Sequence, residues 1–124
     1  ESAGDIARCC LESLALCYRW AIDVLEDLTG RSIETIRIVG GGCRNQMLCQ
    51  FTADACRRPV VAGPVEASAL GSVMIQAVAT GHLPDIAAGR QAIAASVTQQ
   101  LYEPREGEAW EAAYARYEKI VNRS

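Results

Sequence analysis

Apolar residues recur at helical spacing through the first part of the chain. Between residues 5 and 28 they fall at every third or fourth position, the spacing of one face of an α-helix. Charged side chains lie largely on other faces, and Gly30 is a typical residue just beyond a helix C-terminus. The pattern predicts a helix over residues 5–28 with a buried face of Ile6, Cys10, Leu14, Cys17, Ala21, Val24 or Leu25, and Leu28.

Two short β-branched runs interrupt the helical pattern. Residues 35–39 are β-branched except for Arg37 and end at glycines, which predicts a well-buried strand. Residues 59–62 predict a second strand, and Gly63 followed by Pro64 ends it. Residues 99–102 fit either an extended segment or a loop.

Four more segments are predicted to be helical. Residues 45–57 place Leu48, Phe51, Thr52 and Ala55 on one side, with Asn45 as a candidate N-cap or first-turn residue. Residues 66–80 are rich in small side chains, so we expect a close packing partner there. Residues 85–95 form a short helix after Pro84, and residues 108–122 form a terminal helix.

The order of these elements indicates an α/β architecture with a short parallel strand pair. Two or three strands are few for a parallel sheet, which normally has both faces covered and more neighbours. We therefore expect the rest of the sheet to precede Glu1 in a longer protein. We also expect the open sheet edge to contact another copy or the rest of that protein.

Composition and charge narrow the class of protein. The chain has 124 residues and a net charge of −3, which fits one globular domain with no attraction to nucleic acid or anionic membranes. No apolar run approaches the roughly 20 residues that span a bilayer. The six cysteines include no CxxC pair, and the single histidine, His82, is distant from them. We expect reduced, mostly buried thiols in a cytoplasmic protein and no metal site.

The first predicted strand runs directly into Gly40, Gly41 and Gly42. A strand, a glycine turn and a helix N-terminus together allow the backbone to approach a phosphate or nucleotide. The phosphate-binding GxxxxGK[ST] motif is missing, and the GxGxxG fingerprint fails because Asn45 replaces its last glycine. From the residues alone, a nucleotide contact and a packing turn both stay open.

The segment IVGGGCRNQMLCQFTADACRRPVVAGPVEASALGSVMIQA resembles the C-terminal part of the FGGY carbohydrate kinases. The shared pattern is an apolar strand, three glycines, Asn45, Gln50, an Ala-Asp pair, a Pro-Val pair and Glu-Ala-x-Ala-Leu-Gly. The GGGCRN, ADAC and VxAGPVEAS segments are most similar to the members that act on L-rhamnulose. The resemblance covers residues 3–80 strongly and the remainder weakly.

The resemblance implies an actin/hexokinase-like (ribonuclease H-like) fold and transfer of the ATP γ-phosphate, with Mg²⁺, to a ketose. The adenosine would lie against the backbone of Gly40, Gly41 and Gly42, and the Asn45 side chain would bond the base. Residues 1–124 would be the ATP-side half-domain, with the phosphate loops, catalytic carboxylate and sugar site in the absent part. The fragment alone would be inactive and would contribute no catalytic or metal-binding residue.

Other functions fit the same residues. The kinase could act on another ketose or polyol, such as fuculose, xylulose or glycerol. The chain could instead be a non-catalytic actin-like interaction module. Cys43 could be a reactive thiol or a structural residue of the turn. Arg44 could bind a phosphate or lie in solvent. Glu66 could contact the ligand or serve the start of its own helix.

Overall fold

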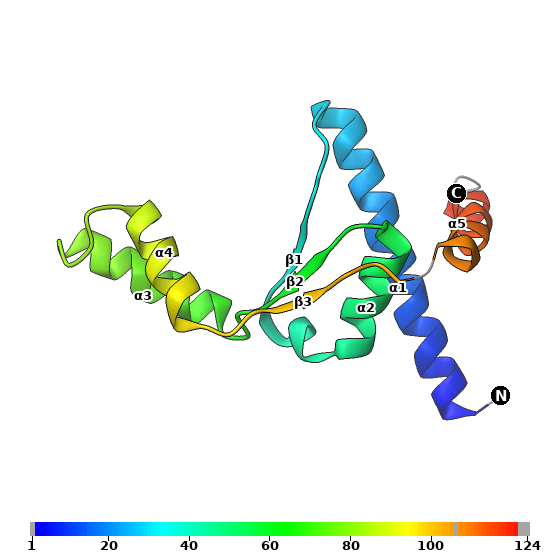
Figure 1. Ribbon diagram of the computed structural model, residues 1–124, viewed down its shortest axis with the longest axis horizontal. Helices are drawn as coiled ribbons and strands as arrows, with labels where there is room; N and C mark the ends of the chain where they lie inside the picture. Colours follow the sequence, from blue (N-terminus) through cyan, green and yellow to red (C-terminus); the bar gives the residue numbers. More distant parts are fainter. Residues whose placement is uncertain (1, 106, 122–124) are drawn as a thin grey trace.

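The computed structural model describes residues 2–105 and 107–121 and has a small sheet with helices at both ends (Figure 1). The long helix α1 lies on one side of α2, which separates it from the sheet, and α5 lies against both helices. The helices α3 and α4 form a hairpin that stands away from the rest of the molecule. The elements are α1 (Ala3–Thr29), β1 (Ile36–Ile38), the 3₁₀ helix η1 (Gly40–Arg44), α2 (Gln46–Cys56), β2 (Val60–Ala62), α3 (Ala67–Ala79), α4 (Ile86–Ser96), β3 (Gln100–Tyr102) and α5 (Glu108–Val121).

The sheet has the order β1-β2-β3 and confirms the predicted parallel pair. Strand β1 runs parallel to β2, with Ile36 opposite Val60, and β3 pairs antiparallel to the other edge of β2. Residues 99–102 therefore do contain a strand. Val60 is fully buried and packs with buried residues of α2 and β3. All predicted helices are present; the last predicted residue, 122, lies outside the described residues.

Helix α1 begins two residues before the predicted range 5–28 and ends one residue beyond it. The Ser2 hydroxyl accepts a hydrogen bond from the Asp5 amide (3.2 Å), and the Asp5 carboxylate accepts one from the Ser2 amide (2.8 Å). This reciprocal capping box satisfies backbone groups at the helix start. The helix ends at Gly30, whose φ of 64° is left-handed and whose amide donates to the Glu26 carbonyl (2.8 Å).

The predicted buried face of α1 is wrong. The buried side chains are those of Ala15, Leu16 and Ile22, which lie on a different side of the helix from the predicted stripe. Of that stripe, Ile6 is 57% exposed and Leu28 79% exposed. The helix carries apolar residues on more than one side, so periodicity alone does not decide which side packs against α2 and α5.

Polar contacts determine how α1, α2 and α5 are joined. The Arg19 guanidinium donates to both carboxylate oxygens of Glu111 in α5 (2.9 Å each) and to the Ala55 carbonyl in α2 (3.1 Å). The Tyr114 hydroxyl of α5 donates to the Asp23 carboxylate of α1. These bonds surround the apolar cluster of Ala15, Leu16, Ala55, Trp110, Tyr114 and their neighbours.

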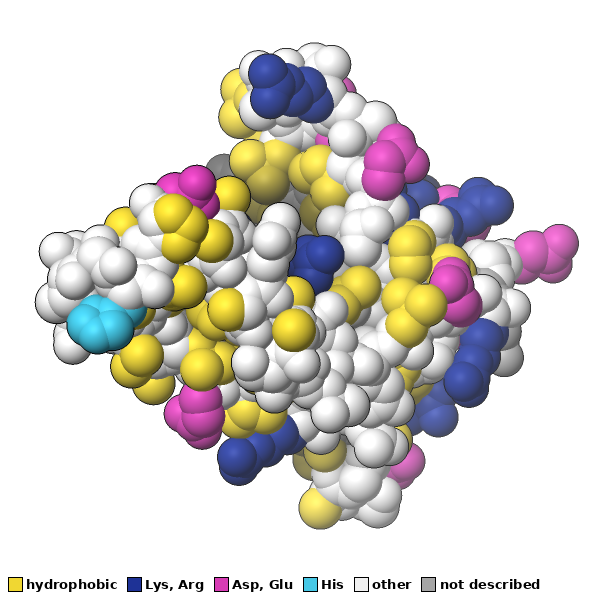
Figure 2. Space-filling view, turned by 60° about the vertical axis from the view of Figure 1, so that its left-hand side comes forward, with side chains coloured by type: hydrophobic (Ala, Val, Ile, Leu, Met, Phe, Trp, Pro, Cys, Tyr) yellow, Lys and Arg dark blue, Asp and Glu magenta, His cyan; other side chains and the backbone are white. Residues whose placement is uncertain are grey.

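The two helices of the α3–α4 hairpin approach each other closely at Gly89. Gly89 in α4 is buried, and a Cβ there would lie 2.3 Å from Cγ of Met74 in α3. The close partner expected for the small residues of α3 is not found at Gly71, where a Cβ would meet nothing of the described chain within 4 Å. Figure 2 shows many hydrophobic side chains on the hairpin surface, in agreement with the half-exposed Val73, Ile75 and Ile86.

All six cysteines carry free thiols. The expectation that most are buried is wrong, since only Cys49 and Cys56 are buried, while Cys9 and Cys10 are exposed on α1. Burial raises the pKa of the Cys56 thiol to about 12. Within residues 2–105 and 107–121, no helix is long and apolar enough to cross a membrane.

Candidate glycine-turn site

The glycine turn connects the end of β1 to the start of α2. After Val39 the chain makes one short 3₁₀ helix, η1, which the sequence did not predict. The Gly40 amide donates to the Pro64 carbonyl (3.0 Å), and the Gly63 amide donates to the Ile38 carbonyl (2.8 Å). The turn is therefore attached to the segment between β2 and α3, which contains the cis Gly63–Pro64 bond.

The fold requires glycine at only one of the three positions of the turn. Gly40 has φ 73°, a left-handed conformation that favours glycine. Gly41 lies outside that range, and a Cβ there would meet nothing within 4 Å. A Cβ on Gly42 would make only an ordinary contact, 3.5 Å from Ile38 Cγ2. The fold of this chain thus explains Gly40 but gives no steric reason for Gly41 or Gly42.

Asn45 is the N-cap of α2, as predicted. Its side-chain oxygen Oδ1 accepts a hydrogen bond from the Leu48 amide (3.0 Å), and its own amide donates to the Gly42 carbonyl (3.1 Å). Asn45 is exposed beside Gly41 and Gly42. The cap uses one acceptor position of Oδ1, and the side-chain nitrogen, which can only donate hydrogen bonds, would be the donor offered to a ligand.

Two thiols support the inner side of the turn. The Cys43 Sγ donates to the Gly40 carbonyl (2.9 Å), so the structure favours the structural role of Cys43. The buried Cys49 Sγ lies 3.9 Å from the Cys43 carbonyl and 4.0 Å from that of Gly42. The pKa of Cys49 is raised, first by burial and then by the neighbouring Cys43 thiol. The two sulfur atoms thus lie against carbonyl groups of η1, while Gly41 and Gly42 are exposed.

A groove of about 590 Å³ lies beyond Pro64, between β1 and the α3–α4 hairpin. It is bounded by Arg37 of β1, by Ala67 and Gly71 of α3, and by Arg90 of α4. The predicted site residues Gly40, Gly41, Gly42 and Asn45 do not line it. Its connection to the turn is the hydrogen bond between Gly40 and Pro64.

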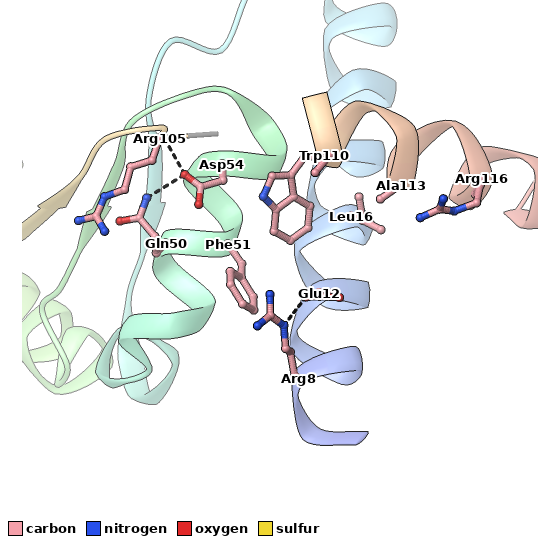
Figure 3. Close-up of a pocket in the computed structure, with 11 residues that line it drawn as sticks. Arg8, Glu12, Leu16, Gln50, Phe51, Asp54, Arg105, Trp110, Ala113 and Arg116 are labelled. Atoms are coloured by element: carbon pink, nitrogen blue, oxygen red, sulfur yellow. Dashed lines mark hydrogen bonds and ion pairs between the residues drawn. The ribbon is translucent and has the colours of Figure 1, made fainter. Parts of the chain in front are cut away.

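A second cavity, of about 400 Å³, lies between α1, α2 and α5 and is lined by both polar and apolar side chains (Figure 3). The buried Asp54 carboxylate accepts hydrogen bonds from the Gln50 side chain and from the Arg105 amide, each 2.8 Å long. The Arg8 guanidinium pairs with Glu12 (2.7 Å). This cavity is also separate from the glycine turn. Its Arg8–Glu12 pair lies within α1, and Asp54 of α2 binds the segment before α5 through the Arg105 amide.

The remaining candidate residues, Arg44, Glu66 and His82, are exposed at the surface. Arg44 is exposed at the end of η1. Glu66 occupies the N-cap position of α3, but its side chain makes no capping hydrogen bond. His82 is exposed, with its Nδ1 2.9 Å from the Thr80 hydroxyl. In the described part of the chain, no three His, Cys, Asp or Glu side chains are grouped as metal ligands would be.

Comparisons with known proteins match most of the chain. Residues 1–80 match the model for the FGGY family of carbohydrate kinases, C-terminal domain. The chain is similar to the rhamnulokinase of Bacteroides thetaiotaomicron, at 49% identity over 98% of this chain and 25% of the relative. It is 47% identical to that of Enterococcus faecalis (83% and 21% covered) and 38% identical to that of Pectobacterium atrosepticum (97% and 24%). The chain spans about a quarter of the length of these curated relatives.

Proposed function

This chain belongs to the FGGY family of carbohydrate kinases, and from that membership we propose that it forms the ATP-side part of a sugar kinase. The sugar would be a ketose, with L-rhamnulose first because the similar proteins are rhamnulokinases. The adenosine of ATP would lie on the exposed backbone of Gly40, Gly41 and Gly42, and the side-chain nitrogen of Asn45 would donate to the base. The proposed site is therefore the outer surface of η1 and the first turn of α2.

The observation that carries this proposal is Gly41. Its φ lies outside the left-handed range, and a side chain there would meet no atom of this chain within 4 Å. A side chain would therefore fit the folded chain, so the reason for glycine is sought in something that approaches from outside. A flat purine nucleoside that lies against the backbone needs the absence of a Cβ at such a position.

Four of the five aspartates of the described chain, all except the exposed Asp27 of α1, support the proposal that the catalytic carboxylate lies elsewhere. Asp5 and Asp85 cap α1 and α4, Asp23 accepts from Tyr114, and Asp54 accepts from Gln50. Each of these carboxylates is therefore occupied by a contact within the chain. A general base and the sugar-binding residues would come from the remainder of a full-length kinase, of which residues 1–124 are a half-domain.

Mg²⁺ would accompany the ATP phosphates in such a reaction. Phosphoryl transfer depends on positioning and on neutralising phosphate charge, and in kinases the metal bridges phosphate oxygens. The described residues provide no group of metal ligands, so we assign no metal site to this chain. Its own contribution would be to bind and orient the nucleoside end of ATP.

The direct test is a kinase assay on a full-length protein that contains these 124 residues. ADP release would be measured with L-rhamnulose, fuculose, xylulose and glycerol at saturating ATP and Mg²⁺. We expect turnover with L-rhamnulose to exceed that with the other acceptors, and no product from the 124-residue chain alone. Turnover with a different acceptor would correct the substrate, and a full-length protein without any sugar-dependent ADP release would contradict the kinase assignment.

A further inference from the structure

We infer that the exposed apolar face of α1 is the surface on which the rest of a full-length sugar kinase packs. The inference rests on the proposed function, because it takes this chain to be one part of a longer enzyme. To that function the inference adds where this chain contacts the rest of the enzyme. We define the α1 stripe by its six residues: Ile6, Cys10, Leu14, Ala21, Leu25 and Leu28.

The α1 stripe lies on one side of the helix and is open to solvent along most of its length. Leu28 is 79% exposed, Ile6 57%, Leu25 49% and Leu14 43%. At 1.5 Å per residue it extends for about 33 Å, and none of its six members is charged. A surface helix normally turns its continuous apolar face toward a core. Here the core uses the side with Ala15 and Ile22, and five of the six members of the α1 stripe, all except the half-buried Ala21, remain exposed.

The strand that follows α1 also presents an unfinished surface. Ile36 donates to the Pro59 carbonyl and Ile38 accepts from Gly63, so the backbone groups of both residues point toward β2. Alternate residues of a parallel strand bond to opposite sides, which directs the amide and carbonyl of Arg37 away from β2. Because β1 is an edge strand of the sheet, these groups lie at an open edge. Exposed edges are normally covered or paired.

The relatives identify the occupant that fits both surfaces. They match nearly all of this chain, yet the chain is only about a quarter of their length, so in them these elements sit within a much longer polypeptide. That polypeptide can supply an apolar face for α1 and a strand for β1 together. A second copy that packs stripe against stripe would cover α1 without pairing β1. We therefore assign the contact to the rest of the same kinase chain.

Two adjacent cysteines allow a test without any substitution. Cys9 and Cys10 are both exposed in this chain, but they are about 100° apart around the helix, and only Cys10 lies on the α1 stripe. The full-length protein would be treated with a small maleimide without nucleotide. Labelling of each thiol would then be followed by mass spectrometry of peptide fragments. Cys9 is the matched control, and the same protein unfolded in urea gives the unprotected rate of each thiol.

We expect Cys10 to label at least about tenfold more slowly than Cys9 in the native full-length protein, and equally fast in urea. The difference should persist when the protein is diluted a hundredfold. Equal native rates would overturn the inference, and protection that disappears on dilution would overturn it in favour of a second copy. The labelling rates of Cys9 and Cys10 do not depend on ATP. If Cys10 is protected in a full-length protein that binds no nucleotide, the proposed function is refuted and the packing inference stands.

Discussion

Replacement of Arg19 by methionine should loosen the attachment of α5. The guanidinium is only 17% exposed and makes a bidentate pair with Glu111. It also donates to the Ala55 carbonyl and lies 4.1 Å from the centroid of the Tyr114 ring. Methionine retains the apolar stem of the side chain and removes the charge, so the change isolates these polar contacts.

The expected loss follows from those contacts. A charge-assisted hydrogen-bond pair contributes about 1.5–3 kcal/mol when buried, and we take the lower end because Glu111 is 42% exposed and can be rehydrated. The Ala55 carbonyl and the cation–π contact add roughly 1 kcal/mol. The free energy of unfolding should therefore fall by about 2–3 kcal/mol. For a chain of this size, that corresponds to a decrease in Tm of roughly 10 °C.

The matched control is Arg57, which approaches the same carboxylate. Its nitrogen lies 3.6 Å from Glu111, and its side chain is 66% exposed. Such surface pairs contribute little, so Arg57→Met should change the free energy of unfolding by less than about 0.5 kcal/mol. Urea unfolding followed by circular dichroism would measure both variants. Equal losses for the two arginines would refute the reasoning that burial of the Arg19 network holds α5.

Three further predictions concern packing, acidity and thiol reactivity. Gly89→Ala should destabilise the hairpin by about 1–3 kcal/mol because the new Cβ meets Met74. Gly71→Ala, whose new Cβ meets nothing within 4 Å, should be neutral or stabilise α3 by up to about 1 kcal/mol. Urea unfolding of the two variants measures both changes. The hydrogen bond from Arg19 lowers the pKa of Glu111. The stabilisation from the Arg19–Glu111 pair is therefore fully present above pH 4.5, the ordinary pKa of the carboxyl group, and is lost as the pH falls through the lower pKa of Glu111 in the folded chain. Tm should consequently drop more between pH 5 and 3 in the parent chain than in Arg19→Met. Cys56, whose pKa is raised to about 12, should resist maleimide at pH 8 in the folded chain while Cys9 reacts; equally fast modification would contradict its burial.

The elements of the fold were predictable from the sequence because their boundaries depend on local signals. Gly30 ends α1, Asn45 caps α2, and Gly63 with Pro64 ends β2, and each acts within a few residues of its own position. The FGGY motif was also readable from the sequence, since it depends on residue identities at fixed spacing.

The side on which α1 packs could not be predicted in the same way. It depends on Arg19 and Asp23, whose partners Glu111 and Tyr114 lie about ninety residues away. The close contact of Gly89 with Met74 also depends on how two helices cross, which a glycine within a helical pattern does not reveal. The 3₁₀ form of the glycine turn likewise depends on tertiary bonds such as that from Gly40 to Pro64.

The central claim is that a nucleoside lies on the bare backbone at Gly41. Calorimetric titration of ATP into the full-length enzyme, with and without Gly41→Val, tests it most directly. A side chain there would meet no atom of this chain within 4 Å, so Tm without nucleotide should stay within about 1–2 °C of the parent. The dissociation constant for ATP should rise by at least about tenfold, a loss of about 1.4 kcal/mol. An unchanged ATP affinity in a folded Gly41→Val enzyme would contradict the assignment of the nucleotide site.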